Sequence, residues 1–470
     1  MKWIRPGCFI ILLLSLWLAD SCSHRPPETR QNRQKWDDAT LSGAYNSVGN
    51  HDPKWDKDAR EALDAYAQIW TAPDNERETL SELIGDSAAN AVGAGCQDPM
   101  IRYLYVRYSS DVRAKPLADR QNLYQDAADK LEDSPYPAIR KFYANVGASD
   151  ILWWDRNHGL WQQVVQHRHA AISDLVQAVQ DNSLPVSEAD TATGQLFDLL
   201  QNNEKEATNA YDQIEDALAR QSGAQVMADF VKATFYLRYA WLARGHGASD
   251  QVTPEGWRLF SERLKIARKA LEHAWSRDPQ EPQIPTLMIS IVQGEQSGRP
   301  EMEKWFARAM QADPNNYAAC RAKLHFLLPQ WYGTRDDMLA FGRECVASTN
   351  WGGEVPLILV DAHSEFVTTL SGQDRQDYWF APDVWPDIQS AYQKYAQLNP
   401  DETRFRYPYA WYALECGQTN AFVQQIKLIR QNDGQINYGY FGGKASFDQA
   451  WAEVTGGAVS TNVAAPANGR

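Results

Sequence analysis

A helix pattern that occurs twice between Glu255 and Pro314 constrains this chain most. In the first copy, apolar side chains recur at steps of three and four, which places them on one face of a helix. These side chains are Trp257, Phe260, Leu264, Ala267, Leu271 and Ala274, and the second copy has Met302, Phe306 and Ala309. Each copy stops at an Asp-Pro pair, 35 positions apart, because proline cannot continue a helix. A period in the thirties made of helix pairs is typical of stacked helical-repeat proteins.

The remaining chain also has helical spacing, and no segment shows the alternation of a β-strand. Asp98-Pro99 predicts a capped helix start, Gly245 predicts a helix end, and Thr334 with Asp337 predicts a capping box. Besides the helix at 255–278, helices are expected near residues 58–70, 76–89, 101–108, 117–132, 136–146, 160–181, 186–203, 206–221, 226–243, 283–294, 299–312, 317–328, 334–345, 354–370, 384–398, 404–416, 420–430 and 446–454.

Part of this pattern resembles a known family. The small-large-small face and closing proline are similar to the second helix of a tetratricopeptide repeat (TPR), at Ala267, Leu271, Ala274 and Pro279 and again at Met302, Phe306, Ala309 and Pro314. Weaker copies bring the resemblance to residues 224–430. The stretch 328–333 with Met338 and Phe341 looks like an uncharacterised bacterial branch of this superfamily. The resemblance implies an all-α fold of antiparallel helix pairs stacked as an α-solenoid, and it implies no particular chemistry.

The predicted organisation follows from these patterns and from shifts in composition. The N-terminal half lacks a clean period, so it is either an irregular helical domain or a set of degenerate repeats. The expected segments are a signal peptide (1–21), a flexible tether (22–55), the irregular helical domain (56–222), TPR-like repeats (223–432), a C-terminal capping segment (433–454) and a disordered tail (455–470).

The N-terminus predicts export. Lys2 and Arg5 precede an apolar run, 8–19, that is too short to span a bilayer comfortably but suits a signal-peptide core. The residues before Cys22 fit an ordinary signal peptidase site and also half-resemble a bacterial lipobox, which would lipidate Cys22. We therefore expect a periplasmic protein or a membrane-anchored lipoprotein, with a lipid anchor at Cys22 as its one route to the membrane.

Four further cysteines would enter an oxidising compartment with the mature chain. They are Cys96, Cys320, Cys345 and Cys416. Cys320 and Cys345 lie on neighbouring predicted helices and form the candidate disulfide. The alternative is that all four are buried free thiols that pack as small apolar side chains.

Charge and motifs exclude several kinds of function. With 60 acidic and 46 basic residues the net charge is −14, which argues against nucleic acid and anionic membrane surfaces as partners. His167 and His169 are two positions apart on a predicted helix and point to opposite sides, so they do not chelate a metal together. No metal, phosphate-binding or nucleophile motif occurs in the sequence. We expect no catalytic residue, no cofactor and no metal.

Aromatic residues are the remaining candidates for ligand contact. The chain has 18 tryptophans and 21 tyrosines, most of which we expect to fill gaps between helices. Those at predicted helix boundaries are placed to face a groove, namely Trp153, Trp154, Trp331, Tyr332, Trp379 and Trp385.

These observations favour a non-enzymatic scaffold of the bacterial cell envelope that binds a protein or peptide segment on a curved helical surface. Two alternatives stay open. One is a glycan-binding envelope protein, motivated by export and the many aromatic residues. The other is an all-α carbohydrate-active enzyme with a closed ring of paired helices, which would need two carboxylates that face each other across a deep cleft.

Overall fold

The fold is all-helical. The computed structural model describes residues 30–456 except 70–73, 155–158, 182–183, 246, 248, 401, 434–435 and 437, and these residues contain helices and no strand. The predicted signal peptide, the candidate lipidation site Cys22 and nearly all of the predicted tail lie outside the described residues.

The described chain begins with two helices, α1 (Arg30–Thr40) and α2 (Ser42–Val48). This finding differs from the flexible tether expected over 22–55. Leu41 and Tyr45 are fully buried. Polar side chains of α1 are also buried, and they form ion pairs there: Arg33 bonds Asp37 at 2.8 Å, and Asp37 also bonds Arg140 of a distant helix at 3.1 Å. The polar composition of this segment therefore belongs to a packed helix.

Nine helices follow α2 in the described part of residues 56–222, where the sequence predicts an irregular helical domain, and the short α6 among them was not predicted. They are α3 (Asp56–Ile69), α4 (Asp74–Gly93), α5 (Pro99–Tyr108), α6 (Ser110–Arg113), α7 (Leu117–Glu132), α8 (Ala138–Trp153), α9 (Trp161–Gln180), α10 (Val186–Leu200) and α11 (Glu204–Ala219). Helices that follow each other in the chain pack together, as α3 does with α4 and α8 with α9. The predicted start at Asp98-Pro99 is confirmed, since the Asp98 carboxylate accepts hydrogen bonds from the amides of Met100 and Ile101.

The second half continues in the same way. Its helices are α12 (Gln225–Arg244), α13 (Pro254–Arg277), α14 (Gln283–Glu295), α15 (Arg299–Ala312), α16 (Tyr317–Phe326), α17 (Arg335–Ala347), α18 (Ile358–Thr368), α19 (Gly372–Tyr378), α20 (Val384–Leu398), α21 (Arg406–Glu415), α22 (Thr419–Asp433) and α23 (Lys444–Thr455). Short 3-10 turns lie at Ser249–Gln251, Val355–Leu357 and Tyr438–Phe441. Here too consecutive helices pack against each other, such as α12 with α13 and α21 with α22.

The predicted helix ends in this half are confirmed. Gly245 ends α12 with φ of 73°, a backbone conformation that glycine adopts without strain. Thr334 and Asp337 form the expected capping box at the start of α17, with each side chain bonded to the backbone of the other residue. Asp278 and Asp313 follow α13 and α15 directly, as the Asp-Pro pairs predict.

Helices that are two apart in the chain are also neighbours. α10 packs against α12, α14 against α16, and α18 against α20. Between α16 and α18, Tyr317 bonds Asp361 and Arg321 bonds Glu365, both across 44 positions. Arg343 of α17 bonds Asp387 of α20 across the same 44 positions. Contacts between α16 and α18 and between α17 and α20 thus join residues at the same sequence separation.

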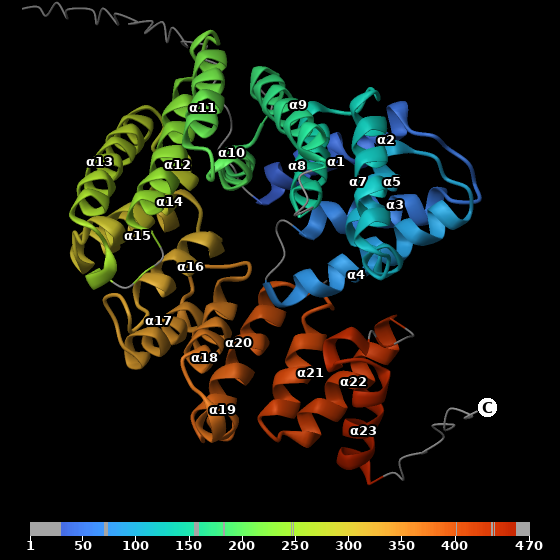
Figure 1. Cartoon of the computed structure of the whole chain (residues 1–470). Coiled ribbons are helices and arrows are strands. Elements are labelled where there is room, and N and C mark those ends of the chain that lie inside the picture. The colour runs from blue at the N-terminus through green and yellow to red at the C-terminus, as the bar shows by residue number, and fades with distance from the viewer. Residues whose placement is uncertain are drawn as a thin grey trace, which may run out of the picture.

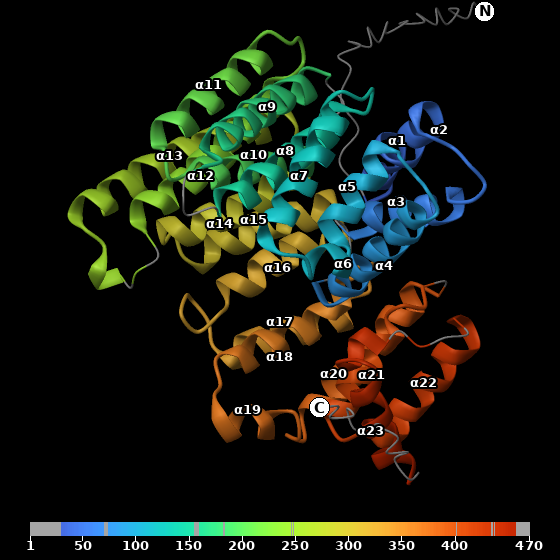
Figure 2. The same cartoon turned by 45° about the vertical axis from the view of Figure 1, so that its right-hand side comes forward.

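The helices follow an arc, and the two ends of that arc meet (Figure 1). Figure 2 shows the same course from another side, with α21 and α22 beside α4. Arg404, just before α21, donates a hydrogen bond of 2.5 Å to the side-chain oxygen of Gln68 in α3, 336 positions away. One continuous apolar core extends from Leu41 to Cys416, and a second cluster lies between α21, α22 and α23.

Candidate functional site

A cavity of about 300 Å³ opens between four helices that alternate along the chain, α10, α12, α14 and α16. It is bounded by side chains from all four helices, and we call it the groove. The lining residues are Asp190, Thr234, Leu237, Arg238, Trp241, Leu287, Ser290, Gln293 and His325. Because no single helix supplies the lining, the groove exists only when the helices are packed side by side.

One wall of the groove is aromatic. Trp241 is half-buried and meets Phe260 edge to face at 5.0 Å between ring centroids. It also lies 6.1 Å from the ring of Trp331 in the same geometry. The guanidinium of Arg244 stacks over Trp241 at 5.5 Å. These contacts fix the Trp241 ring, so it presents a rigid apolar surface to a ligand at little entropic cost.

The groove also contains a histidine that is held in one orientation. Nδ1 of His325 lies 3.1 Å from the side-chain oxygen of Gln293, which itself is buried. Because an amide oxygen can only accept, Nδ1 carries the hydrogen, and Nε2 is left as an acceptor. Burial lowers the pKa of His325, so the ring is neutral at neutral pH. The groove therefore offers an uncharged acceptor on this side.

Two ionisable side chains line the groove, Asp190 of α10 and Arg238 of α12, and Arg238 pairs with Asp198 at 3.5 Å. Thr234 donates a hydrogen bond of 2.8 Å to Asp190, and burial raises the pKa of Asp190 although Thr234 and Arg238 oppose the shift. The guanidinium of Arg238 rests on Gly194, where a Cβ atom would stand 2.2 Å from its Nη2 atom. Gly194 thus leaves the space in which the Arg238 cation lies beside the groove.

Two of the six predicted aromatic residues adjoin the groove. Trp331 and Tyr332 lie between α16 and α17 and are half-buried. The Trp331 ring is 6.1 Å from the His325 ring, and the Tyr332 hydroxyl donates a hydrogen bond of 3.3 Å to the backbone oxygen of Gln293. Tyr332 also stacks on Phe326 at 4.4 Å, so it supports the wall that carries His325.

The other four lie away from the groove. Trp379 is 8% exposed and packs against Tyr378 and Tyr412, and Trp385 stacks on Tyr409 at 5.8 Å. Trp153 and Trp154 lie at the end of α8 and are 44% and 63% exposed. The structure therefore divides the predicted residues into a groove pair, a packed pair and an exposed pair.

All four described cysteines are buried. Cys320 of α16 and Cys345 of α17 are neighbours, and burial, followed by the contact with Cys320, raises the pKa of Cys345. The sulfur of Cys320 is also 3.7 Å from that of Met310. The Cys320–Cys345 disulfide stays a prediction.

Within the part of the chain that the structure describes, no three His, Cys, Asp or Glu side chains are arranged to hold a metal ion. His167 is buried against Asn145 at 2.8 Å, whereas His169 is exposed. His363 is fully buried between Tyr378 at 2.8 Å and Asp387 at 3.2 Å, as a satisfied interior histidine.

Sequence reasoning missed most of the groove. Asp190, Arg238, Gln293 and His325 are ordinary helix residues, and nothing in their local sequence joins them. One signal was present. Thr234 and Gln293 are polar residues in apolar stretches, and both are buried at the groove. Buried polar groups need partners, so such positions indicate a polar site within a helical core.

Comparison with known proteins gives no further guide to the groove. No protein-family model matches the chain, and no curated protein matches it. Among the described residues, no helix combines the length and the apolar character needed to cross a membrane.

The carboxylates near the groove bear on the alternative of a carbohydrate-active enzyme. Among its described lining residues Asp190 is the one carboxylate, whereas a glycosidase needs two on opposite sides of a sugar. Elsewhere Glu132 and Asp174 come together, but both accept a hydrogen bond from the same Asn145 nitrogen, which leaves no room for a sugar ring between them.

Proposed function

We propose that the protein is a TPR-like α-solenoid that binds an extended peptide or protein segment in the groove, without catalysis. The stacking of helix pairs is supported by the packing of alternate helices and by the contacts repeated at 44 positions. The observation that carries the proposed function is that four alternate helices together line one open groove.

The lining suits a peptide chain. An extended peptide presents amide groups at regular spacing, and Gln293, Ser290 and His325 can exchange hydrogen bonds with them. The rigid ring of Trp241 offers one apolar contact for a peptide side chain, while Arg238 offers a positive charge. A few such contacts, spread over several helices, give the specificity of a scaffold.

The cellular setting of this proposal comes from the sequence alone. The charged start, the short apolar run and Cys22 support export to the cell envelope, with or without a lipid anchor. Fractionation of cells that express the full chain, combined with fatty-acid labelling of a Cys22→Ala variant, tests this part. Recovery of the full-length precursor in the cytoplasm would contradict export.

The binding proposal is tested with a displayed peptide library and the purified mature chain. We expect selected peptides to bind the wild type, and Trp241→Ala and Gln293→Ala to weaken binding at least about tenfold, as loss of a central contact does. Trp154→Ala is the matched control, because this exposed ring lies outside the groove. Peptides that bind Trp241→Ala as well as the wild type, or a library that yields none, would refute the groove as the site.

A further inference from the structure

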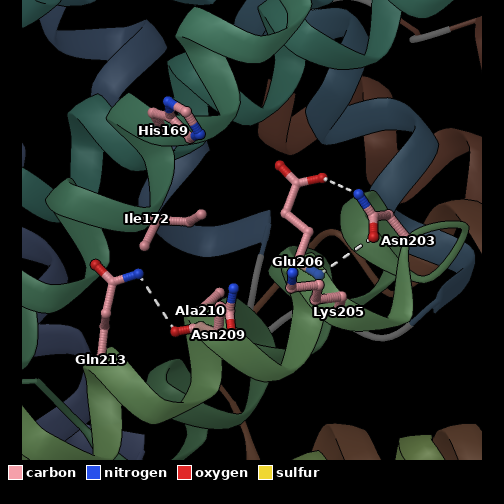
Figure 3. Close-up of a pocket in the computed structure, with 8 residues that line it drawn as sticks. All are labelled: His169, Ile172, Asn203, Lys205, Glu206, Asn209, Ala210 and Gln213. Atoms are coloured by element: carbon pink, nitrogen blue, oxygen red, sulfur yellow. Dashed lines mark hydrogen bonds between the residues drawn. The ribbon is translucent and has the colours of Figure 1, made fainter.

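A second cavity, of about 250 Å³, lies between α9 and α11, helices that do not contribute to the groove. Its base is apolar and buried, formed by Ile172 and Ala210. Its walls are polar and exposed, and they include His169, Asn209 and Gln213. Figure 3 shows His169 and Ile172 on the α9 side, with the side chains of α11 opposite them.

A fixed carboxylate stands at one end of this cavity. Glu206 accepts a hydrogen bond of 3.2 Å from the side-chain nitrogen of Asn203, and the Asn203 oxygen in turn accepts one of 3.3 Å from the Glu206 amide (Figure 3). Glu206 also pairs with Arg168 at 3.4 Å. These bonds hold the carboxylate in place, so it is a pre-oriented hydrogen-bond acceptor for a ligand.

Arg168 links the cavity to a cluster of exposed tryptophans. Its side chain is about 3% exposed and lies over the rings of Trp153 at 5.0 Å and Trp161 at 5.7 Å. Its Nε atom has no hydrogen-bond partner among the described residues. The Trp153 and Trp161 centroids are 5.5 Å apart, and both side chains are 44% exposed. Trp154, the most exposed at 63%, follows Trp153 directly.

Trp153 and Trp161 pack on Arg168 and on each other, yet 44% of each side chain stays exposed, and Trp154 is 63% exposed. Large exposed apolar patches mark binding surfaces in soluble proteins. The walls combine amide groups that both donate and accept with one positive and one negative side chain, Lys205 and Glu206, so the lining has no dominant charge. The small volume admits one ring-sized group, because pockets for larger organic ligands start near 300 Å³.

We infer that this cavity and the three tryptophans form a binding site for a neutral oligosaccharide, separate from the peptide groove. One sugar residue would enter the cavity, where its hydroxyls bond Glu206, Asn209 and Gln213. The next residues would lie on the exposed faces of Trp153, Trp154 and Trp161, since the C–H groups on one side of a sugar ring match a flat apolar ring. This mixture of flat aromatic faces and amide groups suits a molecule that carries hydroxyls at its edges and C–H groups on its faces.

The experiment uses the purified mature chain and an array of defined neutral oligosaccharides, including gluco-oligosaccharides and N-acetylglucosamine oligomers, followed by calorimetric titration with the strongest ligand. Trp154→Ala and Asn209→Ala remove exposed side chains, so the fold is expected to remain. We expect each variant to weaken binding at least fivefold, whereas the groove variant Trp241→Ala binds like the wild type.

Three results would overturn this inference. The first is that no oligosaccharide binds the wild type. The second is that both Trp154→Ala and Asn209→Ala retain full affinity for the sugar. The third is that the protein binds phosphatidylethanolamine–phosphatidylglycerol vesicles, and that this binding is lost in Trp154→Ala but not in Asn209→Ala. That result would assign the tryptophan rings to a lipid surface. Failure of the peptide groove would leave all three tests unaffected.

Discussion

Glu132 and Asp174 accept hydrogen bonds from one and the same nitrogen, the side-chain amide of Asn145, at 2.9 Å each. They come from α7 and α9, and Asn145 of α8 lies between them. His167 completes the cluster through the Asn145 oxygen, at 2.8 Å. Burial, followed by the charge of Glu132, raises the pKa of Asp174 to about 7, so at neutral pH this carboxyl group carries a proton part of the time.

This pair predicts a loss of stability as the pH rises. The folded state binds a proton at Asp174 up to about pH 7, whereas the unfolded chain releases it near the ordinary aspartate pKa of 3.8. The free energy of unfolding therefore falls between these two pKa values and levels off above the folded one. Asp174→Asn removes this dependence, and we expect it to be more stable than the wild type at pH 8 by on the order of 2 kcal/mol.

The check is the midpoint of thermal unfolding of both proteins between pH 5 and pH 8.5. Lys141, Asp129 and His167 also face the cluster and contribute their own charges, so the difference between the two proteins is the quantity to follow. Asp126→Asn, an exposed carboxylate on α7, is the control and should not change the pH profile. A difference between wild type and Asp174→Asn that stays constant over this pH range would contradict the raised pKa of Asp174.

Arg140 anchors the first described helix, α1, to the rest of the fold. It is fully buried, bonds Asp37 at 3.1 Å and Thr40 at 2.6 Å in α1, and stacks over Trp36 at 4.9 Å. Removal of one partner of a buried ion pair leaves an uncompensated charge, so Arg140→Ala should destabilise the protein by about 3–5 kcal/mol. Urea unfolding measures this loss, and hydrogen exchange should show α1 as the first segment to become unprotected.

The control for this variant is an exposed ion pair. Arg258 bonds Glu255 and Glu262 on the surface of α13, with half of each side chain in water. Such pairs contribute little, so Arg258→Ala should unfold like the wild type. If Arg140→Ala and Arg258→Ala had equal effects, the buried network would not be what holds α1 in place.

The same network shows why α1 was not foreseen. Sequence patterns detect a helix through its apolar stripe, and residues 30–40 carry few apolar residues. Arg33 and Asp37 are buried by ion pairs with Glu188 and Arg140, and both partners lie more than 100 positions away in the sequence. No local pattern therefore indicates that these polar residues pack. Most amphipathic helices from Asp56 onwards, by contrast, carry their packing face in their own sequence, and their positions were predicted within a few residues. The short helices α6 and α19 were not predicted, and α8 extends seven residues beyond its expected end at 146.

The groove has the same origin. Trp331 and Tyr332 were identified because they are aromatic residues at a helix boundary, a local property. The partners that give them a site, Trp241 and Gln293, reach them through helix packing. Trp379 satisfied the same local criterion and is buried. Local sequence thus finds residues that could face a ligand, but the packing of the helices decides which of them do.

Gly194 offers a test of the groove that leaves its lining residues unchanged. In Gly194→Ala the new methyl group would stand 2.2 Å from Nη2 of Arg238, so the arginine must move away, which a flexible side chain does at small cost. We expect peptide affinity to fall about threefold to tenfold, as loss of one charged contact does, while the midpoint of thermal unfolding changes little.

Gly93→Ala is the matched control, since the space around Gly93 is open. Binding of a selected peptide, measured by fluorescence anisotropy, compares the two variants under one condition. Arg238→Ala should reproduce the effect of Gly194→Ala, and the double variant should be no weaker than either. Additive losses would mean that Gly194 acts on the ligand by a route other than Arg238.

The burial of Cys320 and Cys345 predicts when a disulfide between them can form. Both side chains are fully buried, and burial raises the pKa of Cys345, so the folded protein offers almost no thiolate for exchange. A disulfide must then form before α16 and α17 close over the pair.

We expect protein from an oxidising compartment, alkylated in denaturant without reductant, to yield a Cys320–Cys345 crosslinked peptide, while Cys96 and Cys416 are alkylated. Closing this loop should add about 3 kcal/mol of stability, which Cys345→Ala would remove and Cys416→Ala would not. Alkylation of all four thiols in the protein from that compartment would show that the pair stays reduced and packs as two apolar side chains.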